Sequence, residues 1–305
     1  MNNKVLITGA RGQLGQALLR ARPSSWTVSA FGSDQLDISD ADAVGRAVQR
    51  IRPTLILNAA AYNAVDHAET DTSRAIAVNA DGPLNLVRAA NQVGARLVHV
   101  STDYVFDGTA RQPYGELAEP NPVNLYGRSK LLGEQQVLAE QPHALVVRTA
   151  WVYGDAPNNF VATVLKAARG AKPLRVVDDQ TGAPTFAANL AQAIVELAAH
   201  GDADAGIYHY TGATALTRYE FAKAILEVAV SIDEEDRPEN AKAMSAYRAA
   251  LASLQAISSN EYPSAAIRPN YTVLDCRKIM RLGIAVKPLM HDLPHIVRQL
   301  MQSRR

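Results

Sequence analysis

Short apolar runs alternate with segments of helical periodicity through the first half of the chain. Val5, Leu6 and Ile7 are continuous, as in strands buried on both faces, and Ala17, Leu18 and Leu19 follow at helical spacing. Strands are predicted at residues 4–8, 27–31, 55–58, 96–101 and 145–148. This alternation is typical of an α/β fold with a doubly wound parallel sheet of the Rossmann type.

The helices between these strands carry recognisable end signals. Ser39 is predicted to cap a helix that Pro53 closes. Residues 73–91 are expected to be helical, with an interruption around Asp81, Gly82 and Pro83. A further helix should carry Tyr126 and Lys130 and extend to about Glu140.

Beyond Thr149 the pattern loosens, which indicates a second unit. Helices are predicted at 161–169, at 188–199, after Thr217 and at 290–301, and strands at 175–177 and 206–210. Residues 231–255 are expected to form a helical excursion of little chemical content. We therefore predict a dinucleotide-binding domain at 1–150 and a smaller α/β domain, mainly for substrate, at 151–305; the boundary is approximate, and the chain can cross back over it.

Bulk composition narrows the class of protein. The 305 residues are 48% hydrophobic and 20% charged, with a formal net charge of +1, so no nucleic-acid or membrane-surface partner is indicated. Cys276 is the only cysteine, which excludes an internal disulfide. The apolar run at Val5–Ile7 is too short for a signal peptide, and a cytoplasmic location is predicted.

The first predicted strand leads directly into a glycine-rich turn. Gly9, Arg11, Gly12, Gln13, Leu14 and Gly15 follow Thr8 at Gly-x-x-Gly-x-x-Gly spacing. A strand, a glycine turn and a helix in this order can present backbone N–H groups to a pyrophosphate. The alternative is a tight turn without a ligand, but its place at the start of an alternating β/α chain favours nucleotide binding.

Proton-transfer groups gather after the fourth strand. Thr102 stands at the end of that strand, and Tyr126 and Lys130 are spaced i, i+4 on a helix, which places both on one face. A tyrosine keeps its proton at neutral pH and can donate it, and a nearby ammonium eases its release. Alone, the pair is as easily a solvated amphipathic face; its order after Thr102 favours catalysis.

Cofactor choice in such folds is usually made just after the second strand. An acidic side chain there binds the ribose hydroxyls of NAD, but Gly32 occupies that position. Arg11 and Ser33 could instead bind a 2′-phosphate, which predicts NADPH. The alternative is that Asp34 takes the acidic role, which would favour NADH.

Other chemistries find little support in the sequence. The seven histidines have no metal-ligand spacing, so no metal is assigned, and no Gly-x-Ser-x-Gly elbow suggests a hydrolase.

Several separate motifs, spread almost end to end, carry a resemblance to a known family. The chain resembles the extended short-chain dehydrogenase/reductase superfamily and, within it, the dTDP-4-dehydrorhamnose reductases. The matching segments are 9–15, 58–62, Val65-Asp66 with Ala68-Glu69, 101–108, 126–130 with Gly133-Glu134, 148–153, 158–160, 179–180 with 182–185, and Arg268-Pro269 before Leu274-Asp275.

The resemblance implies roles for particular residues. Thr102, Tyr126 and Lys130 would form the catalytic set. The cofactor would be lined by Gly12, Gln13, Leu14, Asp37, Ile38, Ala61, Tyr62, Asn63, Tyr126 and Lys130, and the sugar nucleotide by Val65, Thr102, Asp103 and Trp151. Asn63 and His67 stand where the family usually has threonine and lysine. Some members dimerise through magnesium held by glutamates, but Ala17 occupies the corresponding position, so we predict no metal and a monomer or homodimer.

The implied activity is NADPH-dependent reduction of the C4 ketone of a dTDP-linked 4-keto-6-deoxyhexose, in dTDP-rhamnose biosynthesis. One alternative is another sugar-nucleotide reductase, epimerase or dehydratase, although Tyr104 follows Asp103 where similar dehydratases carry glutamate. The other is a non-catalytic regulatory subunit of the methionine adenosyltransferase type, against which the intact Thr102, Tyr126 and Lys130 argue.

Overall fold

The computed structural model describes residues 3–170, 172–201, 203–236 and 245–302. Six parallel strands form one sheet in the order β10-β5-β4-β3-β1-β2. Their bounds are β1 Lys4–Thr8, β2 Thr27–Phe31, β3 Leu55–Asn58, β4 Arg96–Thr102, β5 Leu145–Thr149 and β10 Gly206–His209. The predicted doubly wound parallel sheet is confirmed, and the strand order reverses between β1 and β3.

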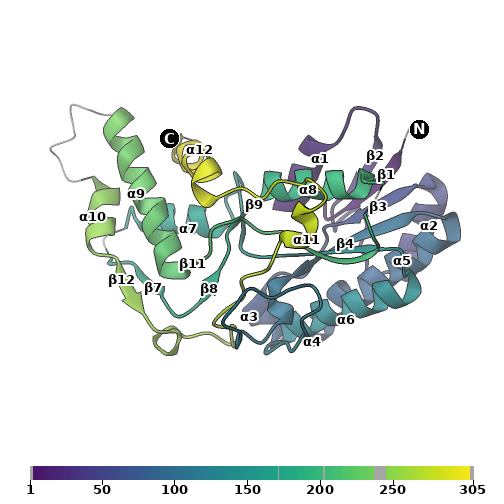
Figure 1. Ribbon diagram of the computed structural model, residues 1–305, viewed down its shortest axis with the longest axis horizontal. Coiled ribbons are helices and arrows are strands. Elements are labelled where there is room, and N and C mark those ends of the chain that lie inside the picture. The colour runs from purple at the N-terminus through teal and green to yellow at the C-terminus, as the bar shows by residue number, and fades with distance from the viewer. Residues whose placement is uncertain (1–2, 171, 202, 237–244, 303–305) are drawn as a thin grey trace.

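Helices cover both faces of the sheet (Figure 1). On one face, α1 (Gln13–Ala21) and α8 (Ala187–Ala199) pack against Val5, Ile7 and their neighbours. On the other, α2 (Ala41–Ile51), α5 (Gly82–Val93) and α6 (Leu125–Glu140) pack against Leu6, Ile56 and Leu97. Successive strand residues thus enter opposite cores, which is why these strands read as continuous apolar runs.

Helix α2 begins one residue later than predicted. Asp40 is its N-cap and accepts a hydrogen bond from Ala43 N at 2.9 Å, so the prediction that Ser39 caps the helix is wrong. Ser39 instead donates to Asp37 through its hydroxyl (2.7 Å) and its backbone N–H (3.0 Å).

The expected interruption near Pro83 is a widened helical turn. Helix α4 (Thr72–Ile76) continues into a π-helical segment, Ala77–Asp81, and then into α5. Pro83 has no N–H to donate, and in a regular helix its ring would clash with the carbonyl four residues earlier, that of Asn79. Short helices α3 (Val65–Ala68) and η2 (Asp103–Val105) complete this side of the molecule.

A second, smaller core lies beyond the sheet, at the left of Figure 1. It is built from α7 (Phe160–Ala167), α9 (Arg218–Asp236), α10 (Ala246–Ala252) and α12 (Leu289–Gln302). Paired short strands flank it: β7 (Arg175–Val177) with β12 (Gln255–Ile257), β8 (Thr181–Gly182) with β11 (Leu216–Thr217), and β6 (Val152–Tyr153) with β9 (Thr185–Phe186). Helices η4 (Ser259–Glu261) and α11 (Arg277–Met280) lie in the C-terminal connections.

The helical excursion predicted at 231–255 is present at both ends, as the end of α9 and as α10; residues 237–244 of that prediction lie outside the described residues. Thr217 does cap α9: it accepts from Glu220 N at 3.1 Å, and Glu220 accepts from Thr217 N at 2.7 Å.

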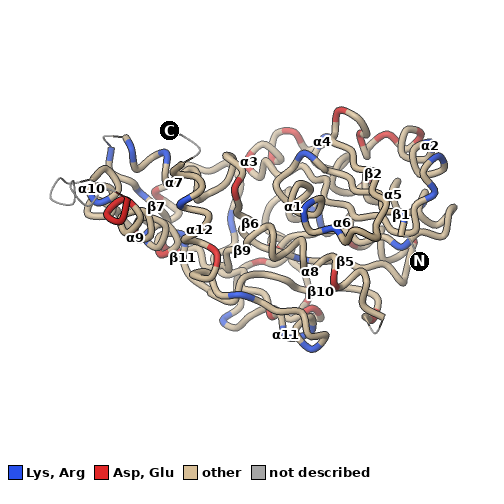
Figure 2. Tube along the Cα trace, turned by 90° about the horizontal axis from the view of Figure 1, so that it is seen from above, with Lys and Arg blue, Asp and Glu red and all other residues tan. Residues whose placement is uncertain are grey.

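Charge is mixed along the trace, with basic and acidic positions interspersed on both parts of the molecule (Figure 2). In the described part of the chain, no helix is long and apolar enough to cross a membrane.

Candidate active site

The glycine turn lies where the strand order reverses. Gly9 has φ +69°, and a Cβ on it would lie 2.5 Å from Ala60 N, in the loop after β3. A Cβ on Gly15 would lie 2.2 Å from the Gly9 carbonyl oxygen. Because only a hydrogen atom fits at Gly9 and Gly15, the loop after β1, the loop after β3 and the start of α1 approach one another closely. The N-terminal turn of α1 then lies at the carboxyl ends of β1 and β3. This cradle fits the pyrophosphate of a dinucleotide.

The two candidates for cofactor choice contact one another. Arg11 Nη2 lies 2.8 Å from Asp34 Oδ2, and both side chains are about half exposed or more (67% and 49%). Gly32 lies beneath this pair, since a Cβ there would come within 2.9 Å of the Arg11 stem. An exposed ion pair of this kind is weak and exchanges readily for another partner.

Asp37 and Ile38 differ in what they can offer a ligand. Burial acts to raise the pKa of Asp37, but hydrogen bonds from Ser39 and Arg74 outweigh it and hold that pKa below its usual value. Ile38 is buried and packs on Gly82, where a Cβ would lie 2.5 Å from its Cδ1. The Ile38 side chain is therefore part of the core, and its backbone carbonyl accepts from Asn85 Nδ2 at 3.0 Å.

Asn79, in the π-helical segment, fixes the loop that carries Tyr62 and Asn63. Its Oδ1 accepts from Tyr62 N at 2.8 Å, and its Nδ2 donates to Tyr62 O at 3.1 Å and to Ser129 Oγ at 3.0 Å. Sequence reasoning missed Asn79; the interruption seen at Pro83 is the signal that points to it. π-Helical turns are frequent at functional sites.

The structure brings Thr102 and Tyr126 together at the end of β4. Both are buried, and Thr102 lies close enough to Tyr126 to lower its pKa against the larger effect of burial. Tyr126 Oη also lies 3.5 Å from Asn63 Oδ1. Asn124 caps α6 by accepting from Gly127 N at 2.8 Å, so the helix starts against this strand end.

Lys130 lies one turn further along α6 and is buried among polar groups. Its Nζ donates to Val100 O at 2.7 Å and lies 3.5 Å from His99 Nε2. Burial lowers the pKa of Lys130 to about 8. Burial also raises the pKa of Tyr126, opposite in direction to the effect expected from a neighbouring ammonium, so Tyr126 keeps its proton firmly.

Asp103 adds a buried carboxyl beside the pair. Thr102 Oγ1 donates to its Oδ1 at 3.0 Å, while among the described residues its Oδ2 has no hydrogen-bond partner. Burial raises the pKa of Asp103 to about 6, although hydrogen bonds with Thr272 and Thr102 act against the rise.

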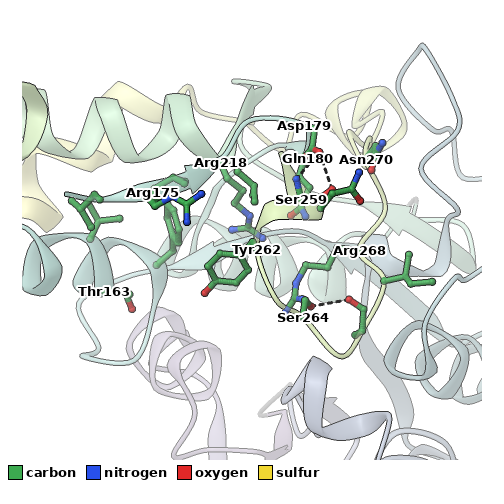
Figure 3. Close-up of a pocket in the computed structure, with 18 of the residues that line it drawn as sticks. Thr163, Arg175, Asp179, Gln180, Arg218, Ser259, Tyr262, Ser264, Arg268 and Asn270 are labelled. Atoms are coloured by element: carbon green, nitrogen blue, oxygen red, sulfur yellow. Dashed lines mark hydrogen bonds between the residues drawn. The ribbon is translucent and has the colours of Figure 1, made fainter. Parts of the chain in front are cut away.

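Next to this end of the sheet lies a cavity of about 790 Å³ (Figure 3). Its polar lining includes three arginines, Arg175, Arg218 and Arg268, and the side chains labelled in Figure 3 come from α7, β7, the loop between β7 and β8, α9 and the 259–270 segment. The cavity lining was not predicted: Asp179, Gln180 and Arg268 were noticed only as motif positions. Concave sites of 300–1,000 Å³ are the usual size for small-molecule ligands.

Trp151 contacts a residue of the cavity lining, and Val65 packs with the cluster that contains Tyr126. Arg218 stacks on the Trp151 ring at 3.5 Å, and Gly182 lies on that indole, where a Cβ would come within 2.5 Å. Trp151 has φ +47°, a strained conformation for a tryptophan. Val65 packs against Tyr104 and Tyr126, while Arg268 pairs with the adjacent Asp66 at 2.6 Å.

Most of the predicted site residues are thus gathered around one site, from the glycine turn to Trp151; the Ile38 side chain is not. Among the residues that the structure describes, no group of three or more His, Cys, Asp or Glu side chains could hold a metal ion.

A doubly wound sheet with a glycine turn at its switch point, and a threonine and tyrosine at a neighbouring strand end, defines the class of extended short-chain dehydrogenases/reductases. The model of the RmlD substrate binding domain family matches residues 3–302. The dTDP-4-dehydrorhamnose reductase of Mycolicibacterium smegmatis is 41% identical over 93% of this chain and 81% of that protein. The chain belongs to the dTDP-4-dehydrorhamnose reductase family.

Solved structures of the family have the same fold. The dTDP-4-dehydrorhamnose reductase of Clostridium acetobutylicum superposes with a TM-score of 0.87 at 34% identity, covering 98% of this chain and 99% of that one. The Bacillus anthracis enzyme, solved in complex with NADP, gives 0.85 at 33% identity, covering 99% and 100%.

Proposed function

We propose that this protein reduces the C4 ketone of dTDP-4-dehydro-L-rhamnose to dTDP-L-rhamnose with NADPH, as a step of dTDP-rhamnose biosynthesis for cell-surface polysaccharide. The observation that carries the proposal is the buried pair of Thr102 and Tyr126 at the end of β4, in a fold that also has a dinucleotide cradle at the switch point of its sheet and a large polar cavity. Family membership and the NADP complex of the Bacillus anthracis relative support it.

A nicotinamide cofactor, when bound, would supply the hydride that C4 receives. The two electrons of the carbonyl π bond then go to the ketone oxygen, and Tyr126 donates its proton to that oxygen. Thr102 orients the oxygen from the end of β4. Because burial raises the pKa of Tyr126, the phenol carries its proton throughout the neutral range and is ready to act as an acid.

The cofactor preference rests on Arg11. The guanidinium is exposed and, among the described residues, pairs with Asp34, so a 2′-phosphate with its greater charge can displace that carboxylate, with Ser33 adding a hydroxyl. Gly32 lets the Arg11 stem and Asp34 lie where a side chain at this position would collide with them. NADH use through Asp34 is the competing arrangement.

The nucleotide end of the substrate is assigned to the cavity. Arg218 and Arg268 bring positive charge to it, and Tyr262 brings an aromatic ring, which suit a diphosphate and a base (Figure 3). Trp151, stacked on Arg218, would then face the sugar between the cavity and Tyr126.

The test is NADPH oxidation on addition of dTDP-4-dehydrorhamnose, with the UDP- and GDP-linked ketosugars as controls. We expect turnover with the dTDP sugar and much weaker use of the others. No turnover with any ketosugar, from protein shown to bind NADPH, would favour the non-catalytic regulatory subunit. The cytoplasmic location, the absence of a metal and the monomeric or homodimeric state stay predictions.

A further inference from the structure

A line of buried polar side chains crosses the sheet beneath the proposed active site. Thr8 on β1, Asn58 on β3 and His99 on β4 stand opposite one another in register, and all three are fully buried. They point to the face covered by α5 and α6, because their neighbours Leu6, Ile56 and Leu97 pack into that core. Buried polar groups of this kind are costly unless each is hydrogen-bonded.

The hydrogen bonds along this line fix the direction of the Asn58 amide. Thr8 Oγ1 donates to Asn58 Oδ1 at 2.7 Å, and Ala60 N donates to the same oxygen at 3.1 Å. Two donors on one side identify it as the oxygen side, so the NH₂ group faces His99 Nδ1, at 2.9 Å. An NH₂ group can only donate, and therefore Nδ1 of His99 is unprotonated.

It follows which nitrogen of His99 carries the proton. Burial lowers the pKa of His99 well below its usual value, so the ring is neutral, and its single proton must be on Nε2. Nε2 lies 3.5 Å from Lys130 Nζ, which also donates to Val100 O at 2.7 Å. An ammonium would set a donor against this Nε2–H, whereas a neutral amine would accept from it through the nitrogen lone pair.

We propose that Thr8, Asn58 and His99 form a positioning relay that favours the neutral amine of Lys130 over its ammonium in the free enzyme, with the amine lone pair on the His99 Nε2–H and one N–H on Val100 O. The second N–H then stays available to a cofactor ribose hydroxyl. The inference rests on the proposed function only in giving Lys130 a role beside Tyr126.

The surroundings of Lys130 are consistent with this assignment. Glu134, on the same helix, acts to raise the pKa of Lys130, but its carboxylate is held by Arg148 of β5 in a buried ion pair at 2.6 Å. The other titratable groups near Lys130 are His99 and, one helical turn earlier, Tyr126, which is uncharged. Burial, the larger effect, still lowers the pKa of Lys130 to about 8.

Protonating Lys130 would disturb the whole line. To accept from an ammonium, His99 would have to move its proton to Nδ1, where it would face the Asn58 NH₂ group. Asn58 would then have to turn over, which would remove the acceptor of the Thr8 hydroxyl and the Ala60 N–H. Each donor left unpaired in a buried site opposes the change.

The tautomer can be read directly from the intact protein by ¹H–¹⁵N correlation through two bonds, on a ¹⁵N-histidine-labelled sample. The His99 signals are assigned by their loss in His99→Gln. We expect the neutral Nε2–H form above pH ~8, where Lys130, with its pKa of about 8, is mainly a neutral amine. In Asn58→Asp, a carboxylate oxygen replaces the NH₂ group, and we expect the proton to appear on Nδ1. An Nδ1–H signal or an imidazolium in the unchanged protein above pH ~8 would overturn the relay.

The effect on Lys130 is measured from the pH titration of its ¹³Cε resonance, assigned by its loss in Lys130→Met. In His99→Leu the titration should move upward by about one pH unit, as expected for one lost hydrogen bond. His99→Gln, which keeps an amide N–H toward Lys130, should restore most of it. Thr8→Val, a gentler change at the far end of the line, should give a smaller upward move.

Thr149→Val is the matched control, because Thr149 is a buried strand-end threonine of the same sheet that has no part in the line. An equal move in Thr149→Val, or no move in folded His99→Leu, would refute the proposal. Neither measurement uses turnover. Full activity of Lys130→Met would therefore refute the catalytic role of Lys130 and leave the relay standing. Loss of activity in Lys130→Met, together with an unmoved titration in His99→Leu, would refute the relay and leave the catalytic role standing.

Discussion

Tyr126 is protonated at neutral pH and has a fixed position. Its ring meets Tyr104 edge to face at 5.8 Å, and burial raises its pKa while Thr102 acts to lower it. The chain order of Thr102, Tyr126 and Lys130 was enough to predict that these residues act together. The burial that governs their proton affinities was not readable from the sequence, because it depends on segments more than twenty residues away.

We expect Tyr126→Phe to lower turnover by roughly 10²–10⁴, the usual contribution of a general acid, because the ring and its packing remain while the proton is lost. Steady-state rates with NADPH measure the loss, and an unchanged thermal transition serves as the control for folding. Turnover close to the unmodified protein would show that another group protonates the sugar.

Arg11 and Asp34 allow a paired test of cofactor choice. Arg11→Ala should reduce kcat/KM with NADPH by roughly 10-fold or more, because one charge-assisted contact with the 2′-phosphate is lost. The kcat/KM with NADH should be almost unaffected. Asp34→Ala releases Arg11 from its 2.8 Å ion pair and should leave NADPH use equal or better. The contrary result has two parts: the unmodified protein uses NADH more efficiently than NADPH, and Asp34→Ala abolishes this use of NADH. In that case Asp34, not Arg11, determines cofactor choice.

Asp103 predicts an unusual dependence of stability on pH. Burial raises its pKa to about 6 from 3.8, so the folded state prefers the protonated carboxyl. Its stabilising effect is complete below about pH 4 and is lost as pH rises through about 6. Asp103→Asn should therefore raise the free energy of unfolding, relative to the unmodified protein, by on the order of 2–3 kcal/mol at pH 8.

The same variant should show little difference near pH 4, and denaturant unfolding at the two pH values provides the comparison. Activity should fall in Asp103→Asn, since the carboxylate faces the proposed sugar site. Equal effects at both pH values would mean that folding leaves the pKa of Asp103 unshifted, and a loss of stability at pH 8 alone would mean that the fold stabilises its anion, contrary to its burial.

At the scale of elements, helix α6 positions Tyr126 and Ser129, and two of its glycines let it approach its neighbours closely. A Cβ on Gly127 would lie 2.1 Å from the Tyr104 carbonyl oxygen, and one on Gly133 would lie 2.2 Å from that of Asn79. Helix α6 can therefore press against η2 and the π-helical segment, which brings Tyr126 to Thr102 and Ser129 to Asn79. The sequence predicted the helix and the interruption before α5, but not this contact, which only three-dimensional packing creates.

Gly127→Ala should push α6 away from β4, lower turnover and destabilise the protein by about 1–3 kcal/mol, the usual cost of overpacking. Gly45→Ala is its matched control, because Gly45 is also within a helix and a Cβ there meets nothing within 4 Å. That control should stabilise the protein by about 0.5–1 kcal/mol and leave turnover unchanged. Equal turnover in the two variants would remove α6 packing as the positioning element.

At the scale of the whole molecule, the chain leaves the sheet after β5 and returns to it. Strand β10 pairs with β5, and α8 covers the face opposite α5 and α6. Sequence patterns identified both elements, but periodicity does not say which core an element joins. The cavity was missed for a related reason: its lining comes from several separate segments between Phe160 and Asn270. No one of these segments has a sequence motif that would by itself predict a cavity.

This return predicts the behaviour of a fragment ending at residue 150. Such a fragment lacks β10 and the four large side chains by which α8 covers the sheet, Leu190, Ile194, Val195 and Leu197, all at most 4% exposed. Burying each contributes about 1.5–3 kcal/mol, so their loss alone amounts to roughly the whole stability of a typical domain, about 5–15 kcal/mol.

We therefore expect the fragment 1–150 to give no cooperative thermal transition by calorimetry and to bind a dye for exposed apolar surface, while the full chain gives a sharp one. Adding α8 and β10 back, in a fragment that runs through residue 210, should improve cooperativity because both faces of the sheet and its open edge at β5 are then covered. A sharp transition in the 1–150 fragment would show that the first five strands fold without the returning segment.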